Sequence, residues 1–450
     1  MNSTKRKIVI IGGGFGGITA AKELKGTDAE VTLIDKANHH LFQPLLYQVA
    51  TAALSPGDIA TPIRALVGKD SGIKVILGEV ENIDPKNKNL TLLKGEIIAY
   101  DQLILAAGAK YNYFGNEQWE HHAPGLKSIS DALQVRERIL LSLEEAEQIS
   151  APELRKPYLT YVIIGGGPTG VEMAGAIAEI TKRSIEQDFS NISKNEARIC
   201  LIEAAPNILN GYPETLAKKA QKMLEDLGVQ VVLNAPVTNI ERDSISFSGK
   251  TIQSPNIIWA AGVVANPLVK SLGAATDRSG RAIVNGDLSL PENRDIFVIG
   301  DAAHFECEEG KPLPAVASVA MQQGRFVGRM LRNDPSTAAS RPVFRYTDKG
   351  TKATIGRAKA VADIKGFRLS GFIAWVMWSF VHILYLAGSR NRRRVFMEWI
   401  WSYFTFNRGV KLITDRSGCS HCHVPGETGK LQDVKVPTKP ERINALALQD

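Results

Sequence analysis

The sequence predicts an α/β protein that contains two parallel-sheet units of the same kind. The first observation is a repeat: VIIGGG occurs in KIVIIGGGFGGITAAKEL (7–24) and again in YVIIGGGPTGVEMAGAIAEI (161–180). The second is that each copy places a short apolar strand before a glycine-rich turn and a helix after it, as in a βαβ unit. The third is composition, since 39 glycines and 7% aromatic residues suit a packed α/β chain of 450 residues.

The charge of the chain is unevenly distributed. The net charge is +7, but residues 341–418 hold 15 Lys and Arg against 4 Asp and Glu, so the rest of the chain is acidic. A basic segment on an acidic body predicts an anionic partner, either nucleic acid or a phospholipid surface. The first apolar strand follows MNSTKRK directly, so we expect no signal peptide and a cytoplasmic location.

The first glycine-rich turn has the spacing of a dinucleotide-binding unit. Gly12-x-Gly14-x-x-Gly17 follows the strand IVII, and the next strand, VTLID, ends in Asp35. The first glycine permits a tight turn, the second lets the backbone approach a pyrophosphate, and the third lets helix and strand pack closely. The pyrophosphate is expected at the positive helix N-terminus, with Asp35 accepting hydrogen bonds from the ribose hydroxyls.

The second turn repeats this arrangement. Gly165-x-Gly167-x-x-Gly170 follows YVII, and the strand ARICLIE ends in Glu203. A carboxylate at that strand end binds the ribose diol and repels a 2′-phosphate, and residues 204–207 offer no Arg to bind such a phosphate. The sequence therefore favours NADH over NADPH.

Two such turns predict two dinucleotides bound at once, and a third element assigns them. The run DIFVIGDAA ends a strand in Gly-Asp, which places Asp301 where it can bind the ribityl or pyrophosphate end of FAD. This order resembles the two-dinucleotide-binding-domain flavoproteins, which implies that the first turn and Asp301 bind FAD and that the second turn binds NADH. Three residues at the ends of the returning strands LILAAGA and IIWAAGV are also expected at the cofactors: Ala107, Gly108 and Gly262.

The same resemblance sets the expected domains. An NADH-binding domain is inserted in the FAD-binding domain, and a helical stretch links them. A C-terminal region of amphipathic helices is expected to bind a membrane, and a flexible tail follows it. The expected bounds are 1–113 and 283–345 for the FAD-binding domain, 128–150 for the linking helix, 155–280 for the NADH-binding domain, 346–416 for the C-terminal region and 417–450 for the tail.

The cysteines indicate that no dithiol relays the electrons. Residues 36–67, where disulfide reductases of this kind carry a cysteine pair, contain none. Cys200 lies in an apolar strand and Cys307 stands alone, so we expect the electron acceptor to meet the flavin directly. Cys419 and Cys422 make half of a zinc site. A second pair of ligands is absent nearby, so we expect a flexible tail and no bound metal.

An aromatic, apolar segment lies near the C-terminus. GFIAWVMWSFVHILYLAG (371–388) contains no formal charge, and RNRRR and VFMEWIWSYFTF follow it. Tryptophan favours the membrane interface, and arginine favours anionic headgroups. Residues 371–388 could just cross the bilayer as a helix. Residues 371–406 could instead lie in its interface as two amphipathic helices, or bury a homodimer interface. We expect binding to a phospholipid surface, and no motif supports binding to nucleic acid.

The chain resembles type II NADH:quinone oxidoreductases. HHLFQPLLYQVATAALSPGDIA (39–60), GTKATIGRAKAV (350–361) and SGFIAWVMW (370–378) look like that family, especially its actinobacterial members. The resemblance implies FAD, NADH, a membrane quinone as acceptor, and a peripheral place on the cytoplasmic face of the inner membrane. The sequence offers no proton path, so we expect no proton pumping. The alternatives are transfer to a soluble acceptor, such as a ferredoxin-like protein or a small oxidant, and an NADH-sensing flavoprotein.

The resemblance also implies the reactive residues. The family's quinone motif Ala-Gln-x-Ala-x-Gln-Gln corresponds to 317–323, where Ser318 replaces the first glutamine. Glu172, just after the second turn, is either a proton relay near the nicotinamide and flavin or a carboxylate that favours the helix dipole. The implied quinone-site residues are Gln48, Ala317, Ser318, Ala320 and Gln322, and the implied catalytic residues are Glu172, Gln322 and Gln323.

Overall fold

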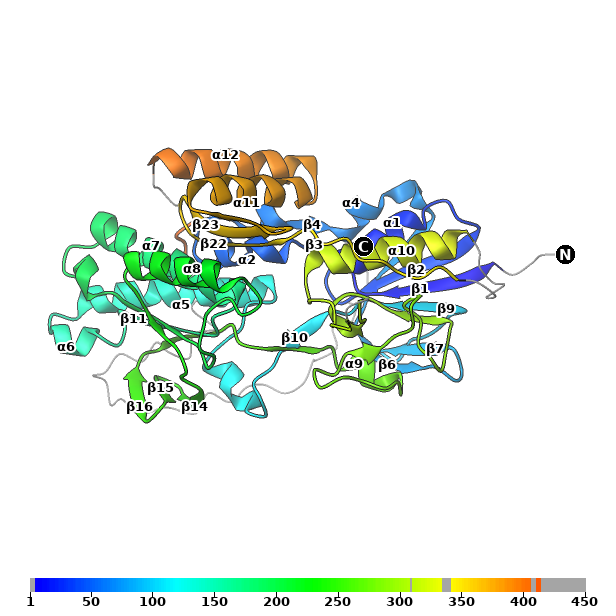
Figure 1. The fold of residues 1–450 in the computed structure, drawn as a ribbon, viewed down its shortest axis with the longest axis horizontal. Helices are drawn as coiled ribbons and strands as arrows, with labels where there is room; N and C mark the ends of the chain where they lie inside the picture. The colour runs from blue at the N-terminus through cyan, green and yellow to red at the C-terminus, as the bar shows by residue number, and fades with distance from the viewer. Residues whose placement is uncertain (1–4, 308–309, 334–340, 406–409, 414–450) are drawn as a thin grey trace, which may run out of the picture. The chain divides into compact units, whose positions relative to one another are not determined.

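Two parallel sheets, one for each glycine-rich repeat, form the core of the fold (Figure 1). The computed structural model describes residues 5–307, 310–333, 341–405 and 410–413. Every element named below lies in the unit that extends to Leu412. The predicted flexible tail, with Cys419 and Cys422, lies outside the described residues.

The first sheet takes its strands from both sides of the second repeat. Its strands are parallel in the order β20-β9-β1-β2-β5, and the apolar side chains of its central strands are buried on both faces. Helices α1 (Phe15–Glu23) and α10 (Ala317–Arg332) pack over one face. The strands are β1 (Arg6–Ile11), β2 (Ala29–Asp35), β5 (Ile73–Leu77), β9 (Gln102–Leu105) and β20 (Ile296–Val298).

Small antiparallel elements cover the opposite face of this sheet. A three-stranded sheet and a short helix bury Val9, Leu103 and Val298 on that side. The sheet is formed by β6 (Val80–Asp84), β7 (Asn89–Leu92) and β8 (Ile97–Ala99), and the helix is α9 (Leu268–Ser271).

The second sheet is parallel in the order β13-β12-β11-β17. Three helices bury one face, and a small antiparallel sheet covers the other. The parallel strands are β11 (Thr160–Ile164), β12 (Arg198–Ile202), β13 (Val229–Val232) and β17 (Asn256–Trp259). The helices are α5 (Ile129–Gln148), α7 (Pro168–Asp188) and α8 (Glu214–Asp226), and the antiparallel strands are β14 (Val237–Glu241), β15 (Ser244–Phe247) and β16 (Lys250–Gln253).

Two antiparallel strands connect the sheets. The chain leaves the first sheet through β10 (Ala109–Tyr111) and returns through β18 (Val263–Ala265), and these two strands pair with each other. Because β20 joins the first sheet only after the second sheet is complete, the second unit is inserted in the first. This topology confirms the predicted α/β fold class with two dinucleotide-binding units, while the exact domain bounds remain predictions.

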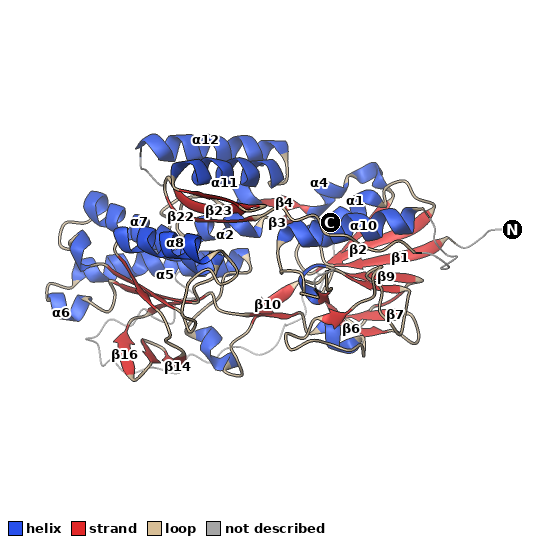
Figure 2. Cartoon of the chain, in the orientation of Figure 1, coloured by secondary structure: helices blue, strands red, loops and turns tan. Residues whose placement is uncertain are grey.

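The C-terminal part packs on α7 (Figure 2). It consists of β22 (Thr351–Gly356), β23 (Lys359–Ile364), β24 (Phe367–Ser370), α11 (Phe372–Tyr385) and α12 (Ser389–Thr405). The packing is tight, because a Cβ at Gly175 would lie 1.6 Å from the Ile355 oxygen. The apolar stretch 371–388 forms the single helix α11 and ends at Gly388, whose φ of 85° lies in the turn before α12. In the described part of the chain, no helix has the length and apolar character needed to cross a bilayer.

The segment after β2 joins the first sheet to these C-terminal helices. It forms β3 (His39–Leu41), a 3-10 turn η1 (Gln43–Leu45), α2 (Leu46–Ala50), α3 (Pro56–Ile59), β4 (Ala60–Pro62) and α4 (Ile63–Val67). The buried Arg136 of α5 fixes it, since Nε donates to the Val49 oxygen at 2.8 Å and Nη2 donates to the Leu54 oxygen at 2.9 Å. The remaining short elements are η2 (Lys69–Ser71), η3 (Glu117–His121), α6 (Pro152–Arg155), η4 (Lys194–Glu196), β19 (Ala282–Ile283), η5 (Gly300–Ala302) and β21 (Ala303–His304).

Candidate functional site

The two glycine-rich turns have nearly the same geometry. Gly12 and Gly165 have φ values of 103° and 107°, which favour glycine. A Cβ at Gly17 would lie 1.8 Å from the Gly12 oxygen, and a Cβ at Gly170 would lie 1.8 Å from the Gly165 oxygen. Both helices therefore pack against their own turns as a dinucleotide-binding unit requires.

The middle glycine of each turn faces open space. A Cβ added at Gly14 or Gly167 would meet no atom within 4 Å. Both residues also cap the helix that follows, so free backbone N–H groups and the positive helix end point to the same place. Each turn can therefore receive a pyrophosphate without rearrangement, which fits the FAD and NADH assigned to them.

The acid at the end of each second strand is tied to its turn. Asp35 accepts hydrogen bonds from the backbone N–H of Gly13 at 2.5 Å and of Ala37 at 2.6 Å. Glu203 accepts from Gly166 at 2.5 Å and from Ala205 at 2.8 Å. A carboxylate has about four acceptor sites, so each acid can still accept from a ribose hydroxyl.

The Gly-Asp turn η5 is held by α10. The buried Gln323 accepts a hydrogen bond from the Gly300 N–H at 2.6 Å, and a Cβ at Gly300 would lie 3.2 Å from the Ala320 Cβ. Burial raises the pKa of the Asp301 carboxyl, while Lys127 and Arg281 act in the opposite direction. Gln323 thus holds the turn that carries Asp301, and its implied catalytic role stays a prediction.

The other cofactor residues lie where β9 and β17 end. Ala107 and Gly108 follow β9, and their carbonyl oxygens accept from Asn266 at 3.4 Å and 3.0 Å. Gly262 follows β17 at a φ of 64°, and a Cβ there would come within 2.8 Å of the Phe114 ring. These residues lie beside the paired strands β10 and β18, between the two parallel sheets.

The motif residues of α10 contact the segment before β22. Ser318 Oγ lies 3.1 Å from the Tyr346 hydroxyl. The Gln322 amide binds the Thr347 backbone twice, because Nε2 donates to its oxygen at 2.9 Å and Oε1 accepts from its N–H at 3.0 Å. Ser318 and Gln322 therefore hold α10 against the residues that precede β22.

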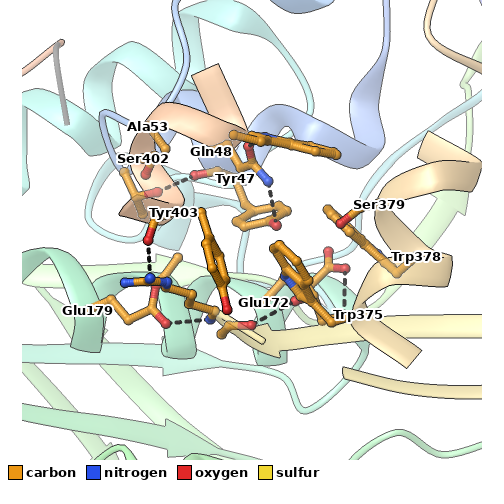
Figure 3. Close-up of a pocket in the computed structure, with 16 residues that line it drawn as sticks. Tyr47, Gln48, Ala53, Glu172, Glu179, Trp375, Trp378, Ser379, Ser402 and Tyr403 are labelled. Atoms are coloured by element: carbon orange, nitrogen blue, oxygen red, sulfur yellow. Dashed lines mark hydrogen bonds between the residues drawn. The ribbon is translucent and has the colours of Figure 1, made fainter. Parts of the chain in front are cut away.

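A cavity of about 110 Å³ lies between the second unit and the C-terminal helices (Figure 3). Side chains from α2, α7, β22, α11 and α12 converge on it. Of the implied site residues, Gln48 and Glu172 line it, whereas those of α10 are not among its described lining residues. Its lining residues include Tyr47, Gln48, Glu172, Thr354, Trp378 and Trp399.

Gln48 connects the cavity to α12. Its Nε2 donates to the Tyr47 hydroxyl at 2.8 Å, and its Oε1 accepts from the Trp399 Nε1–H at 2.8 Å. The Trp399 ring also stacks on Trp378 with centroids 5.5 Å apart. One side of the cavity is therefore a hydrogen-bonded and stacked aromatic wall that α11 and α12 hold in place.

Glu172 is a buried acid, and few nearby groups stabilise its charged form. Burial raises its pKa to about 8, and the Thr354 N–H, 3.4 Å from Oε1, offsets this only in part. The nearby Trp378 indole also lowers that pKa, although its Nε1 lies outside hydrogen-bond geometry with every described residue. The carboxyl is therefore protonated at pH 7 and lies at the cavity with a proton to give.

His382 is a neutral histidine that lies next to Trp378. Burial lowers its pKa to about 4. Its Nδ1 donates to the Trp378 oxygen at 2.7 Å, because that carbonyl can only accept, and its ring stacks on Trp378 with centroids 4.0 Å apart. The histidine thus orients Trp378 toward the cavity.

Sequence reasoning missed this wall. Tyr47 and Trp378 lie in stretches that carry the family resemblance, but nothing in the sequence pairs them with Trp399, and the aromatic segment predicts only a membrane or homodimer surface there. Their positions on α11 and α12 gave no signal that one face of each ring would close a cavity, because the partner Gln48 lies more than 300 residues earlier in the chain.

Replacing Trp399 with phenylalanine is expected to loosen this wall and weaken the binding of a substrate in the cavity. The change keeps the stacked ring but leaves Gln48 Oε1 without its donor. Losing one such hydrogen bond costs about 1 kcal/mol, roughly fivefold in KM for a substrate bound there. Steady-state kinetics measure this, with Trp401→Phe, an exposed residue of the same helix, as the matched control. Equal KM values in both variants would contradict the role of this hydrogen bond.

Neither described cysteine contributes to the cavity. Cys200 is buried in β12, and Cys307 is a free, partly exposed thiol. Among the described residues, no group of three or more His, Cys, Asp or Glu side chains is placed to hold a metal ion.

The fold has two glycine-rich units, one inserted in the other, and a cavity between the second unit and the C-terminal helices. This arrangement defines a class of two-dinucleotide oxidoreductases. Residues 6–324 match the family described as pyridine nucleotide-disulphide oxidoreductase, and residues 349–408 match the NDH2 C-terminal domain. The chain is 41% identical to the type II NADH:quinone oxidoreductase Ndh of Mycobacterium tuberculosis, over 92% of this chain and 91% of that protein. The chain belongs to the type II NADH:quinone oxidoreductases.

Further comparisons agree with this assignment. The NdhA protein of Mycobacterium tuberculosis, also named a type II NADH:quinone oxidoreductase, is 40% identical over 92% of this chain and 90% of its own length. The structure of NDH2 from Plasmodium falciparum in complex with NADH superimposes with a TM-score of 0.82, covering 89% of this chain and 99% of that one. At 23% identity this match supports the fold.

Proposed function

We propose that this chain oxidises NADH and reduces a quinone, with FAD as its bound cofactor. The cavity beside Glu172 carries the proposal, because it joins an aromatic wall, an amide and a protonated buried acid, the groups that a quinone head needs. The overall reaction takes NADH, a proton and a quinone to NAD⁺ and a hydroquinone. FAD, when bound, accepts two electrons from NADH and passes them to the quinone.

The residues of the chain position the reactants and supply a proton. The turn at Gly12, Gly14 and Gly17 holds FAD, with Asp35 and Asp301 at its sugars, and the turn at Gly167 holds NADH with Glu203 at its ribose. The cavity walls orient the quinone and keep water from the reacting atoms. The Glu172 carboxyl donates a proton to a quinone oxygen as the electrons arrive and is protonated again from solvent.

The direct test is a two-step reaction on the purified holoenzyme. The flavin is reduced anaerobically with NADH and then mixed with a short-chain menaquinone or ubiquinone analogue, while its absorbance is followed by stopped flow. Rapid reoxidation by micromolar quinone is expected. Fast reduction followed by reoxidation with a ferredoxin-like protein or a small oxidant, but not with quinone, would contradict the proposal.

The exposed apolar face of α11 and α12 supports binding to a phospholipid surface. Large apolar side chains are more exposed here than a soluble surface usually allows, and exposed arginines begin α12, where anionic headgroups would meet them. We place the chain on the cytoplasmic leaflet, which carries such lipids. The apolar residues are Phe372, Ile373, Val376, Phe380, Leu384, Phe396, Met397, Ile400, Trp401 and Phe404, and the arginines are Arg390, Arg392, Arg393 and Arg394.

Replacing Phe380 and Phe404 with serine is expected to release the chain from vesicles. These side chains are 67% and 74% exposed, so the change removes apolar area without touching the core. Burying two such rings contributes about 3 to 6 kcal/mol, enough to lower membrane partitioning at least a hundredfold. Flotation with phosphatidylglycerol-containing vesicles measures this.

The matched control for this experiment changes two exposed apolar residues elsewhere. Leu93 and Ile97, 62% and 67% exposed beside the first sheet, are replaced by serine and should leave flotation unchanged. If the variant floats like the wild type but sediments as a monomer where the wild type is a dimer, the apolar face is a homodimer interface instead.

A further inference from the structure

Lys127 is a partly buried cation that none of the described residues neutralises. It lies in the loop before α5, and its backbone oxygen accepts a hydrogen bond from Gln43 Nε2 at 3.3 Å. Its ammonium lies over the Tyr111 ring, 5.5 Å from the centroid, and no described acceptor or carboxylate lies within bonding distance. Burial lowers its pKa. A partly buried charge without a partner usually binds a ligand or a counter-charge.

The opposite charge is near but not in contact. Lys127 and Asp301 act on each other electrostatically, yet no ion pair within 4.0 Å joins them in the described structure. Arg281 also acts on Asp301, but its Nε is committed to Asp277 at 2.7 Å. Two partly buried, opposite charges that act on each other without forming an ion pair leave both available to a bound group.

Lys127 lies between two of the sites described above. On one side is the Gly-Asp turn that we assign to FAD, and on another, through Gln43, is the segment that continues to Tyr47 and Gln48 at the cavity. FAD held by that turn would have its ring between the turn and the cavity if it passes electrons from the NADH site to the quinone. We propose that the Lys127 ammonium faces the pyrimidine edge of the flavin and favours its reduced form over its oxidised form.

The charge balance explains this preference. If FAD is bound as assigned, hydride from NADH would bring one proton and two electrons to its ring. The ring would then carry one additional negative charge at its pyrimidine edge. A fixed ammonium at this edge offsets the new charge without reorganisation, and it acts little on the neutral oxidised ring.

The test compares the two-electron midpoint potential of the flavin in holoenzyme variants, measured by dye equilibration without any quinone. Lys127→Met is expected to weaken the reduction equilibrium at least tenfold, a fall of about 30 mV, while oxidised FAD stays bound. Lys127→Arg, which keeps the charge, should stay within threefold of the wild type. Lys182→Met is the matched control, because Lys182 is also partly buried but donates to the Leu227 oxygen, away from the turn.

Each outcome decides the question. An unchanged potential in Lys127→Met overturns the proposal and leaves the lysine a structural role. If Lys127→Met and Lys127→Gln are isolated without FAD while Lys127→Arg retains it, the charge acts on oxidised FAD, and the proposal is again overturned. The inference rests on the FAD assignment, but not on the acceptor, so a failed quinone assay and an unchanged potential can be told apart.

Discussion

Valine at Gly14 is expected to give a folded protein that does not retain FAD, whereas valine at Gly167 is expected to keep FAD and block NADH. Both glycines have extended backbones, with φ of −73° and −71°, which other residues adopt freely. A Cβ at either position meets no protein atom within 4 Å. The new side chain therefore costs the fold nothing and fills the place expected for a pyrophosphate.

The two variants separate the two dinucleotide sites. The flavin absorbance of purified protein should disappear in Gly14→Val, while its melting temperature stays near that of apoprotein from the wild type. In Gly167→Val we expect the KM for NADH to rise at least a hundredfold, about 2.7 kcal/mol. If Gly167→Val loses FAD and Gly14→Val retains it, the assignment of the two cofactors is reversed.

The control positions are the third glycines. Gly17→Ala and Gly170→Ala would place a Cβ 1.8 Å from a carbonyl oxygen of the preceding turn. These variants should lose the fold of their unit as well as the ligand. Gly14 and Gly167 have room for a side chain, whereas Gly17 and Gly170 have none. Comparing the two pairs therefore distinguishes loss of the ligand from loss of the fold.

Glutamine at Glu172 is expected to slow quinone reduction at least tenfold while flavin reduction by NADH stays unchanged. The change keeps the shape of the side chain but removes its proton. General acid catalysis contributes about a hundredfold or more, and water that enters the cavity would replace part of this. Stopped flow measures the two half-reactions separately. A wild-type steady-state rate in Glu172→Gln would show that this carboxyl supplies no proton to the quinone.

The pH dependence gives an independent check. A group whose folded pKa is about 8 is protonated below that value and loses its proton above it. The quinone half-reaction of the wild type should therefore be constant near pH 7 and fall by up to tenfold per pH unit well above pH 8. Glu172→Gln should give a flat profile over the same range, and Glu179→Gln, at the same cavity on the same helix, should keep the wild-type profile.

The parts of this fold that sequence predicts are those set by local backbone geometry. The turn at Gly12 needs a positive φ and a close helix, and both requirements are visible in residue spacing. The helix 128–150 was predicted close to its observed bounds, Ile129–Gln148. Two glycine turns of equal spacing were enough to predict the repeated unit, whereas the insertion of the second unit in the first followed only from the family resemblance.

The cavity wall could not be predicted in this way. The contact between Gln48 and Trp399 depends on how α2 and α12 meet in space, and neither residue lies in a periodic pattern that specifies it. The environment of Gln323 is a similar case. Motif likeness implied a reacting amide, but the structure shows it accepting from the Gly300 N–H. Lys127 carried no sequence signal, because an isolated lysine in a loop is usually exposed.

The Trp399 hydrogen bond to Gln48 has a consequence for how the enzyme matures during translation. Both parallel sheets are complete in sequence by Arg332, the end of α10, and Phe344 and Tyr346 then complete the core of the first unit, so both units can fold on the ribosome before α12 is made. The cavity wall cannot close until α12 has left the exit tunnel. A nascent chain stalled between these points would already be reducible by NADH but would lack a finished quinone site, so the acceptor side is assembled last.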